Sequence, residues 1–113
     1  MSDDVDQPVS ADALRIGISY AGSEVTIVVD GDLDLSGIEL FVARCSEALR
    51  FCPALIVLDA RGLVFIDSAG LMAMWRAGDA AEAAGVAFRV SKATPAVRRV
   101  VELLGLHELL SRE

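Results

Sequence analysis

Ser68 lies where a covalent modification could change the charge of the protein surface. The stretch Ile66-Asp67-Ser68-Ala69-Gly70 follows an apolar run and leads into a segment of helical periodicity, so Ser68 is expected at a helix N-terminus. The free N–H groups and the positive dipole end at such a terminus favour an anion, including a phosphate esterified to the serine. The alternative is that Asp67 or Ser68 only caps the helix.

The helix that Ser68 begins is expected to have a core face and a docking face. At about 100° per residue, Ser68, Met72, Trp75 and Asp79 fall on one line, whereas a stripe of mostly small residues faces the core. That stripe comprises Ala73, Met74, Ala77, Gly78, Ala81 and Ala84. Met72 and Trp75 are then directed to solvent beside Arg76 and Asp79, as a docking patch. The alternative places Trp75 at the edge of the core.

The chain lacks the residue sets of common catalytic and metal sites. His107 is the only histidine, and isoleucine replaces the first glycine of a hydrolase elbow before Ser68. Cys45 and Cys52 lie seven residues apart in one predicted helix and are interpreted as buried, reduced thiols. No glycine-rich phosphate loop is present. We therefore predict no enzymatic activity, no metal and no cofactor.

Length and charge favour one acidic domain. The 113 residues are 54% hydrophobic, enough for one core, and 10 basic against 17 acidic residues leave a net charge of −7. That charge has the wrong sign for nucleic acid or anionic lipid. No apolar run reaches the length of a membrane span, and the acidic start is unlike a signal peptide. A soluble cytoplasmic protein without nucleic-acid or membrane partners is expected.

The first half of the chain predicts a tail, a hairpin and a helix. Residues 1–12 are acidic without periodicity and are expected to form a flexible tail, and alternation over 14–20 and 25–29 predicts an antiparallel strand pair. Ser36 and Glu39 form a predicted capping box, and Leu35 with Leu40 a hydrophobic staple. Pro53 ends this helix. Its buried stripe is expected to comprise Ile38, Phe41, Val42, Cys45, Ala48, Leu49 and Cys52.

The second half alternates strands and helices. We expect a strand at 55–58, a loop at 59–66, a helix at 68–84, a strand at 86–90, a helix from Thr94 and Pro95 to Gly105, and an apolar turn at 106–110. This order predicts an α/β fold, in which an N-terminal antiparallel hairpin is followed by right-handed β-α crossovers onto one mixed sheet covered by helices.

Three segments together resemble the STAS domain of bacterial anti-sigma factor antagonists. They are the motif Asp67-Ser68-Ala69-Gly70-Leu71, the turn Gly31-Asp32-Leu33-Asp34 and the helix Pro95-Ala96-Val97-Arg98-Arg99-Val100. The resemblance runs from about Leu14 to Leu110, so residues 13–113 are expected to form a STAS domain. Two departures are Ala69, where a second serine is frequent, and Met72, where a small residue often follows the leucine.

The resemblance implies a phosphorylation switch. Ser68 would be the serine that a cognate anti-sigma factor kinase phosphorylates, with Asp34 aiding the contact and a serine phosphatase resetting it. The unphosphorylated protein would bind the anti-sigma factor and free a sigma factor. The expected partner-binding residues are Asp32, Asp34, Asp67, Ser68, Ala69, Gly70, Met72, Trp75, Arg76 and Asp79.

Two other functions remain as alternatives. The first is a constitutive STAS scaffold, or a subunit of a stress-signalling or lipid-transport complex, in which Ser68 is only a helix cap. The second is a small enzyme using Asp67 or Asp34, which is disfavoured because no second acid, base or metal is placed to help.

Overall fold

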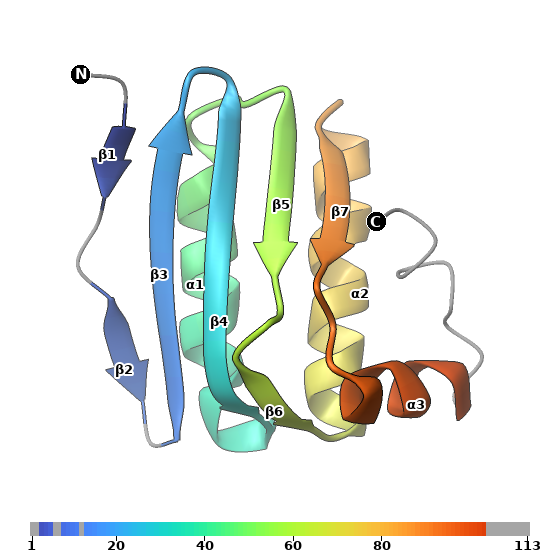
Figure 1. Cartoon of the computed structure of the whole chain (residues 1–113). Helices are drawn as coiled ribbons and strands as arrows, with labels where there is room; N and C mark the ends of the chain where they lie inside the picture. The colour runs from blue at the N-terminus through green and yellow to red at the C-terminus, as the bar shows by residue number, and fades with distance from the viewer. Residues whose placement is uncertain (1–2, 6–7, 12, 104–113) are drawn as a thin grey trace.

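The computed structural model describes residues 3–5, 8–11 and 13–103 (Figure 1). The strands of these ranges form one mixed sheet in the order β1-β3-β4-β5-β7, with β2 also paired to β3 and β6 to β4. They are β1 (Asp3–Val5), β2 (Val9–Ala11), β3 (Leu14–Ala21), β4 (Glu24–Leu33), β5 (Leu55–Asp59), β6 (Leu63–Ile66) and β7 (Ala87–Ser91). The predicted mixed α/β fold is confirmed.

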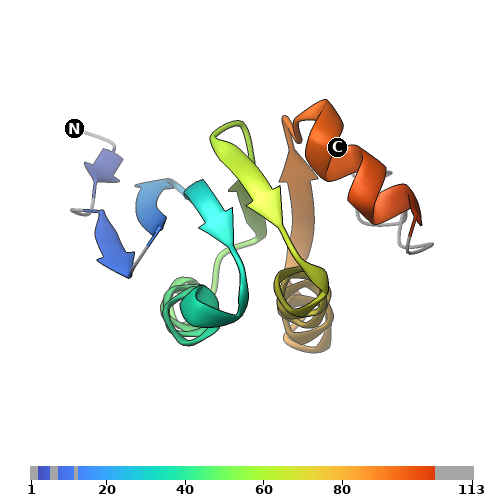
Figure 2. The ribbon, with the colours of Figure 1, turned by 90° about the horizontal axis from the view of Figure 1, so that it is seen from below.

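Two helices cover one face of this sheet. The helices are α1 (Ile38–Leu49), preceded by the short 3-10 helix η1 (Leu35–Gly37), then α2 (Ser68–Ala83) and α3 (Pro95–Leu103). Figure 2 shows α1 and α2 side by side under the sheet, while α3 lies beyond the β7 edge. Within the described ranges, no helix has the length and apolar character needed to cross a membrane.

The strongest sequence patterns predicted their elements correctly. The hairpin of β3 and β4 pairs in one continuous antiparallel register, from Leu14 opposite Gly31 to Ala21 opposite Glu24. The helix α2 begins at Ser68, and α3 begins at Pro95 with the Thr94 hydroxyl accepting a hydrogen bond from the Val97 N–H at 3.3 Å. The expected end of this last helix at Gly105 and the turn at 106–110, with His107, lie outside the described residues.

The N-terminal segment differs from the prediction of a tail without regular structure. Asp3–Val5 and Val9–Ala11 form β1 and β2, and both pair antiparallel with β3. These pairings satisfy backbone N–H and C=O groups along an edge of β3 that would otherwise be open. A three-residue strand is too short to show periodicity, so the sequence carried no signal for it.

The predicted loop at 59–66 contains a further strand. After the turn that follows Asp59, β6 runs parallel to the end of β4, with Asp32 opposite Phe65 and Leu33 opposite Ile66. The pairing register shifts between Gly31 and Asp32. The unpaired residue at this shift is Val64 of β6. Gly31 has a φ of +97°, which favours glycine, and a Cβ there would lie 2.0 Å from the Ala13 carbonyl oxygen.

The predicted capping box at Ser36 is wrong, because Asp34 caps this turn instead. The Asp34 carboxylate accepts hydrogen bonds from the Ser36 N–H at 3.0 Å and from the Ser36 hydroxyl at 2.6 Å. The chain then passes through η1 before α1 begins at Ile38. Leu35 is 75% exposed and therefore forms no staple with Leu40.

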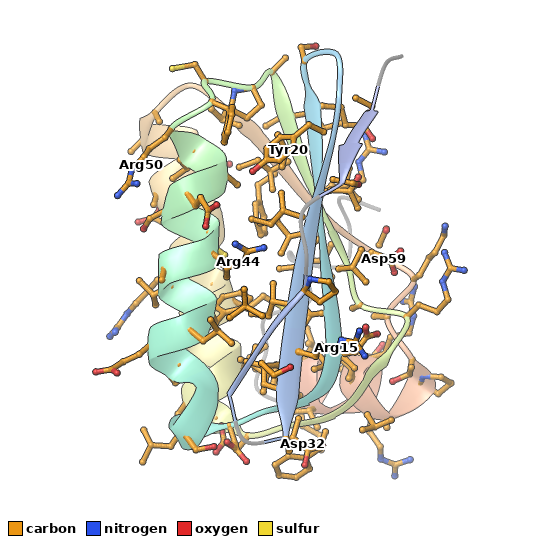
Figure 3. The ribbon with its side chains drawn as sticks, turned by 90° about the vertical axis from the view of Figure 1, so that its left-hand side faces the viewer. Arg15, Tyr20, Asp32, Arg44, Arg50 and Asp59 are labelled. Atoms are coloured by element: carbon orange, nitrogen blue, oxygen red, sulfur yellow. The ribbon has the colours of Figure 1, made fainter. Side chains whose placement is uncertain are left out.

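The buried face of α1 also differs from the predicted stripe. Phe41, Cys45 and Ala48 are buried as expected, but Val42 and Cys52 are exposed. Arg44 is buried instead, at 5% exposure, and donates a 2.8 Å ion-pair hydrogen bond to Glu47 (Figure 3). A pattern of apolar residues cannot reveal a buried arginine, since its burial depends on how α1 packs against β3 and β4.

The Cys45 thiol predicts a loss of stability at alkaline pH. Burial raises the pKa of this thiol from its ordinary value of 9.0 to about 12. In the unfolded chain the thiol ionises near pH 9, whereas in the folded chain it stays neutral. The stability that this difference provides is therefore complete below pH 9 and is lost as the pH rises toward 12, by up to about 1.4 kcal/mol per pH unit.

Chemical denaturation between pH 8 and pH 11 checks this expectation. The free energy of unfolding of Cys45→Ala should depend less steeply on pH than that of the wild type. Cys52→Ala is the matched control, because Cys52 is exposed, and it should keep the wild-type slope. Equal slopes for all three proteins would contradict the assignment.

Candidate functional site

The candidate site lies where the end of β4 meets the start of α2. The Asp67 N–H donates to the Leu33 carbonyl at 3.3 Å. A Cβ on Gly70 would lie only 2.1 Å from the same Leu33 oxygen, so α2 can approach β4 this closely only with glycine there. This contact brings the turn of residues 31–34 beside the turn of residues 67–70. It thereby gathers two of the three segments singled out in the sequence.

Asp67 caps α2 and leaves Ser68 without a capping role. The Asp67 carboxylate accepts a 2.8 Å hydrogen bond from the Gly70 N–H, and its backbone is extended. Ser68 is the first helical residue and is exposed. Among the described residues, its hydroxyl has no hydrogen-bond partner. The hydroxyl is therefore presented at the positive end of α2 with its proton and lone pairs available.

The cap predicts a graded effect of Asp67 substitutions. Asp67→Ala removes the acceptor of the Gly70 N–H and should lower the free energy of unfolding by about 1 kcal/mol. Asp67→Asn keeps a side-chain oxygen in place and should cost less. Urea denaturation of both variants measures the difference. Equal losses in the two variants would show that the negative charge, rather than the acceptor, provides the stabilisation.

The predicted docking patch along α2 is only partly exposed. Met72 is 42% exposed and Asp79 is exposed, but Trp75 is half-buried and packs against the core. The expectation that Trp75 is directed to solvent is therefore wrong, and its alternative, the edge of the core, holds. The buried face of α2 differs from the predicted stripe, since Gly70 and Leu71 are buried as well, whereas Ala77 is half-buried and Ala84 is exposed.

The other predicted contact residues lie around the same end of the fold. Arg76 is exposed and Ala69 is half-buried on α2. Asp32 and Asp34 are half-buried on the neighbouring turn, and Figure 3 shows Asp32 at that end of the sheet. Asp34 already accepts two hydrogen bonds from Ser36, so its carboxylate orientation is set by the local turn.

Sequence reasoning missed two apolar side chains near Ser68. Leu35 of η1 is 75% exposed, and Phe65 of β6, which pairs with Asp32, is 50% exposed. Together with Met72 they form what we call the apolar rim. The sequence predicts Leu35 in a staple and Phe65 in a loop, and the burial along β6, with Val64 and Phe65 exposed between buried Leu63 and Ile66, shows no alternation that could have revealed Phe65. Exposed large apolar side chains beside polar groups are typical of docking surfaces.

The acidic groups of this end do not form a metal site. Among the described residues, no group of three or more histidine, cysteine, aspartate or glutamate side chains is arranged to hold a metal ion. What the arrangement offers is a nucleophilic hydroxyl at a helix N-terminus, flanked by carboxylates and by the apolar rim.

Comparison with known proteins gives one family and several structures of the same fold. Residues 16–111 match the family model described as "Mlab, STAS domain". No curated protein matches the chain significantly.

Three solved structures illustrate the fold. An anti-sigma factor antagonist from Mycobacterium paratuberculosis has a TM-score of 0.75 at 19% identity, covering 89% of this chain and 86% of that one. The unphosphorylated anti-sigma factor antagonist SpoIIAA, from Bacillus, has a TM-score of 0.72 at 24% identity, covering 84% of each chain, and is also known in a phosphorylated form. A sulfate transporter family protein from Wolinella succinogenes has a TM-score of 0.70 at 16% identity, covering 80% and 74%.

Proposed function

The chain belongs to the STAS domain family, and we propose that it is an anti-sigma factor antagonist whose binding is switched off by phosphorylation of Ser68. The unphosphorylated protein binds an anti-sigma factor with serine kinase activity, and a sigma factor is released. The observation that carries this proposal is the exposed Ser68 hydroxyl at the N-terminus of α2, which has no capping role because Asp67 supplies the cap.

The reaction is a phosphoryl transfer to Ser68. The serine oxygen bonds to the γ-phosphorus of ATP, the bond from that phosphorus to the β-phosphate oxygen breaks, and ADP leaves. The hydroxyl proton passes to a base on the kinase. A serine phosphatase reverses the modification by hydrolysis. This chain supplies only the acceptor and the surface that presents it.

The switch follows from charge. Phosphorylation adds about −1.5 to −2 units at neutral pH. In the free protein, water and the N-terminal end of α2 stabilise that charge. In a complex the phosphate would be desolvated near the carboxylates of Asp67, Asp34 and Asp32, and that cost weakens binding.

The same surface defines the chemistry of the partner. The apolar rim offers area to bury, and the carboxylates around it favour a partner with basic side chains. We expect Arg76 and Asp79 to lie at the periphery, because they are about one and two turns beyond Met72 along α2. Trp75 packs against the core and therefore supports partner binding by holding α2 in place, rather than by contacting the partner directly.

Phosphopeptide mapping tests the proposal. The protein, captured from native cells and also incubated with the co-captured kinase and ATP, should carry phosphate on Ser68, and Ser68→Ala should carry none. Ser46→Ala is the matched control, since Ser46 is an exposed serine on α1 away from the site, and it should be phosphorylated like the wild type. Phosphate on another serine, or none with an active kinase, would contradict the switch.

The alternative that such a failure would favour is a constitutive scaffold or subunit. The structural likeness to a sulfate transporter family protein supports it, because the same fold occurs there in another setting. A scaffold would bind its partner equally well with Ser68, alanine or aspartate at this position.

A further inference from the structure

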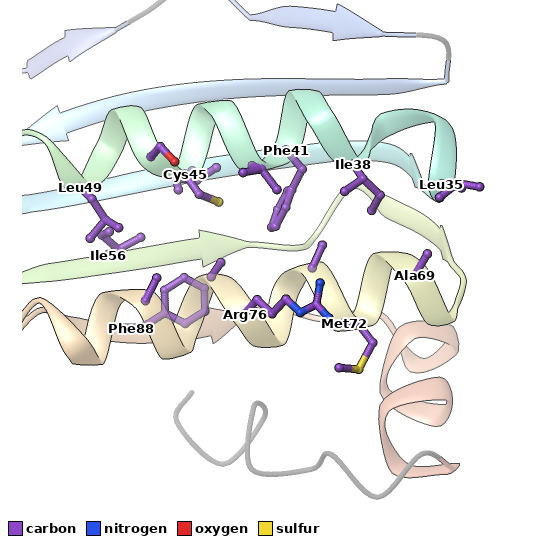
Figure 4. Close-up of a pocket in the computed structure, with 16 residues that line it drawn as sticks. Leu35, Ile38, Phe41, Cys45, Leu49, Ile56, Ala69, Met72, Arg76 and Phe88 are labelled. Carbon is purple, nitrogen blue, oxygen red and sulfur yellow. The ribbon is translucent and has the colours of Figure 1, made fainter.

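A groove between α1 and α2 extends from the surface of the proposed switch along the length of both helices. Its volume is about 650 Å³, within the range of small-molecule sites. The floor includes Ile27, Ile56 and Phe88 of the sheet, and Figure 4 shows Phe41 and Cys45 on the α1 side. We propose that this groove binds a fatty acid, with the acyl chain between the helices and the carboxylate on Arg76.

The shape and lining of the groove suit an unbranched acyl chain. Its α2 wall consists mainly of small side chains at steps of four, four and three residues, namely Ala69, Ala73, Ala77 and Ala80. They leave a straight channel along the helix. From Met72 to Ala80 the helix rises about 12 Å, which an extended chain of about ten carbons spans. Of the lining residues, only Ser46 and Arg76 carry a polar group beyond the backbone and the Cys45 thiol.

Arg76 supplies the charge that complements a carboxylate. It lines the groove, is exposed, and has no ion pair or hydrogen bond among the described residues. In Figure 4 its side chain runs along the gap between the helices toward Met72, as helical side chains lean toward the N-terminus. A guanidinium binds a carboxylate through two parallel hydrogen bonds. An unpaired cation over an apolar groove, in a chain of net charge −7, therefore points to an anionic amphiphile.

The ligand site is separate from the phosphorylation site. Ser68 does not line the groove, although Leu35, Ala69 and Met72 do. The groove and the partner surface therefore share apolar residues, but fatty-acid binding does not require the Ser68 hydroxyl. The dodecanoate titrations can fail while the phosphopeptide mapping succeeds, and the reverse.

Calorimetric titration of the delipidated full chain with sodium dodecanoate tests the acyl site. The wild type should bind it saturably with one-to-one stoichiometry. Ala77→Leu and Ala80→Leu should each weaken binding about tenfold or more by filling the channel. Ala83→Leu is the matched control, because Ala83 is an exposed α2 residue outside the groove, and it should bind like the wild type. Ala80 is exposed, whereas Ala77 is half-buried. Ala80→Leu should therefore fold and test the channel even if Ala77→Leu does not fold.

A second titration tests the head group. Arg76→Gln should weaken dodecanoate binding about tenfold and leave 1-dodecanol binding unchanged, whereas Arg89→Gln, with the same charge change on β7, should leave both unchanged. No saturable binding by the wild type, or binding unaffected by both groove-filling substitutions, overturns the proposal. Equal effects of Arg76→Gln and Arg89→Gln overturn the role of Arg76. Binding of an amphipathic peptide without dodecanoate binding would assign the groove to a protein partner instead.

Discussion

Ser68→Asp is expected to weaken binding of the anti-sigma factor by about 30-fold or more, whereas Ser68→Ala binds at least as tightly as the unphosphorylated wild type. A close like-charge contact at an interface costs several kcal/mol, and this substitution adds a carboxylate beside Asp67 at the start of α2. Alanine at the same position cannot be phosphorylated and should bind constitutively. Dissociation constants from calorimetry with the purified partner measure both effects.

Two controls separate charge from shape. Ser68→Asn has nearly the size of Ser68→Asp without its charge and should retain most of the affinity. Ser46→Asp adds the same charge on exposed α1 surface and should have little effect. Equal affinities of Ser68→Asp and Ser68→Ala would rule out the switch, and equal weakening by Asn and Asp would make it a steric effect.

Gly70→Ala is expected to lower the free energy of unfolding by about 3 kcal/mol or more, with a fall in Tm of about 10 °C or more. The added Cβ would lie 2.1 Å from the Leu33 oxygen and 2.9 Å from the Leu33 carbonyl carbon, both backbone atoms of β4. Neither α2 nor β4 can yield without breaking the packing that positions Ser68. The usual gain in helix propensity from glycine to alanine, about 1 kcal/mol, is too small to compensate.

Gly78→Ala on the same helix is the matched control. The nearest atom to its added Cβ would be the Phe88 Cδ2, at 3.1 Å, and this ring belongs to a side chain that can shift by a few tenths of an ångström. The propensity gain and the crowding then nearly cancel, and Tm should change by only a few degrees. Thermal melts of the two variants make the comparison, and similar losses would refute the backbone clash at Gly70.

Local sequence determined the elements whose side chains alternate or recur with a clear period. The alternation from Leu14 to Val29 specified the hairpin of β3 and β4, and the period after Ser68 specified α2. The order of Asp67, Ser68 and Gly70 at a helix start also identified the candidate site. These features depend on residues within a few positions of one another, so they can be seen without knowledge of the fold.

Tertiary structure decided which side chains are covered and which remain available. Whether Trp75 faced water and whether Arg44 was buried depended on elements distant in sequence. The same holds for β6, which is a strand because the end of β4 offers it a partner. Exposure is a property of neighbours rather than of a residue's own type. For that reason the position of the serine in its helix followed from the chain itself, while the surface around it and the groove beside it emerged only on folding.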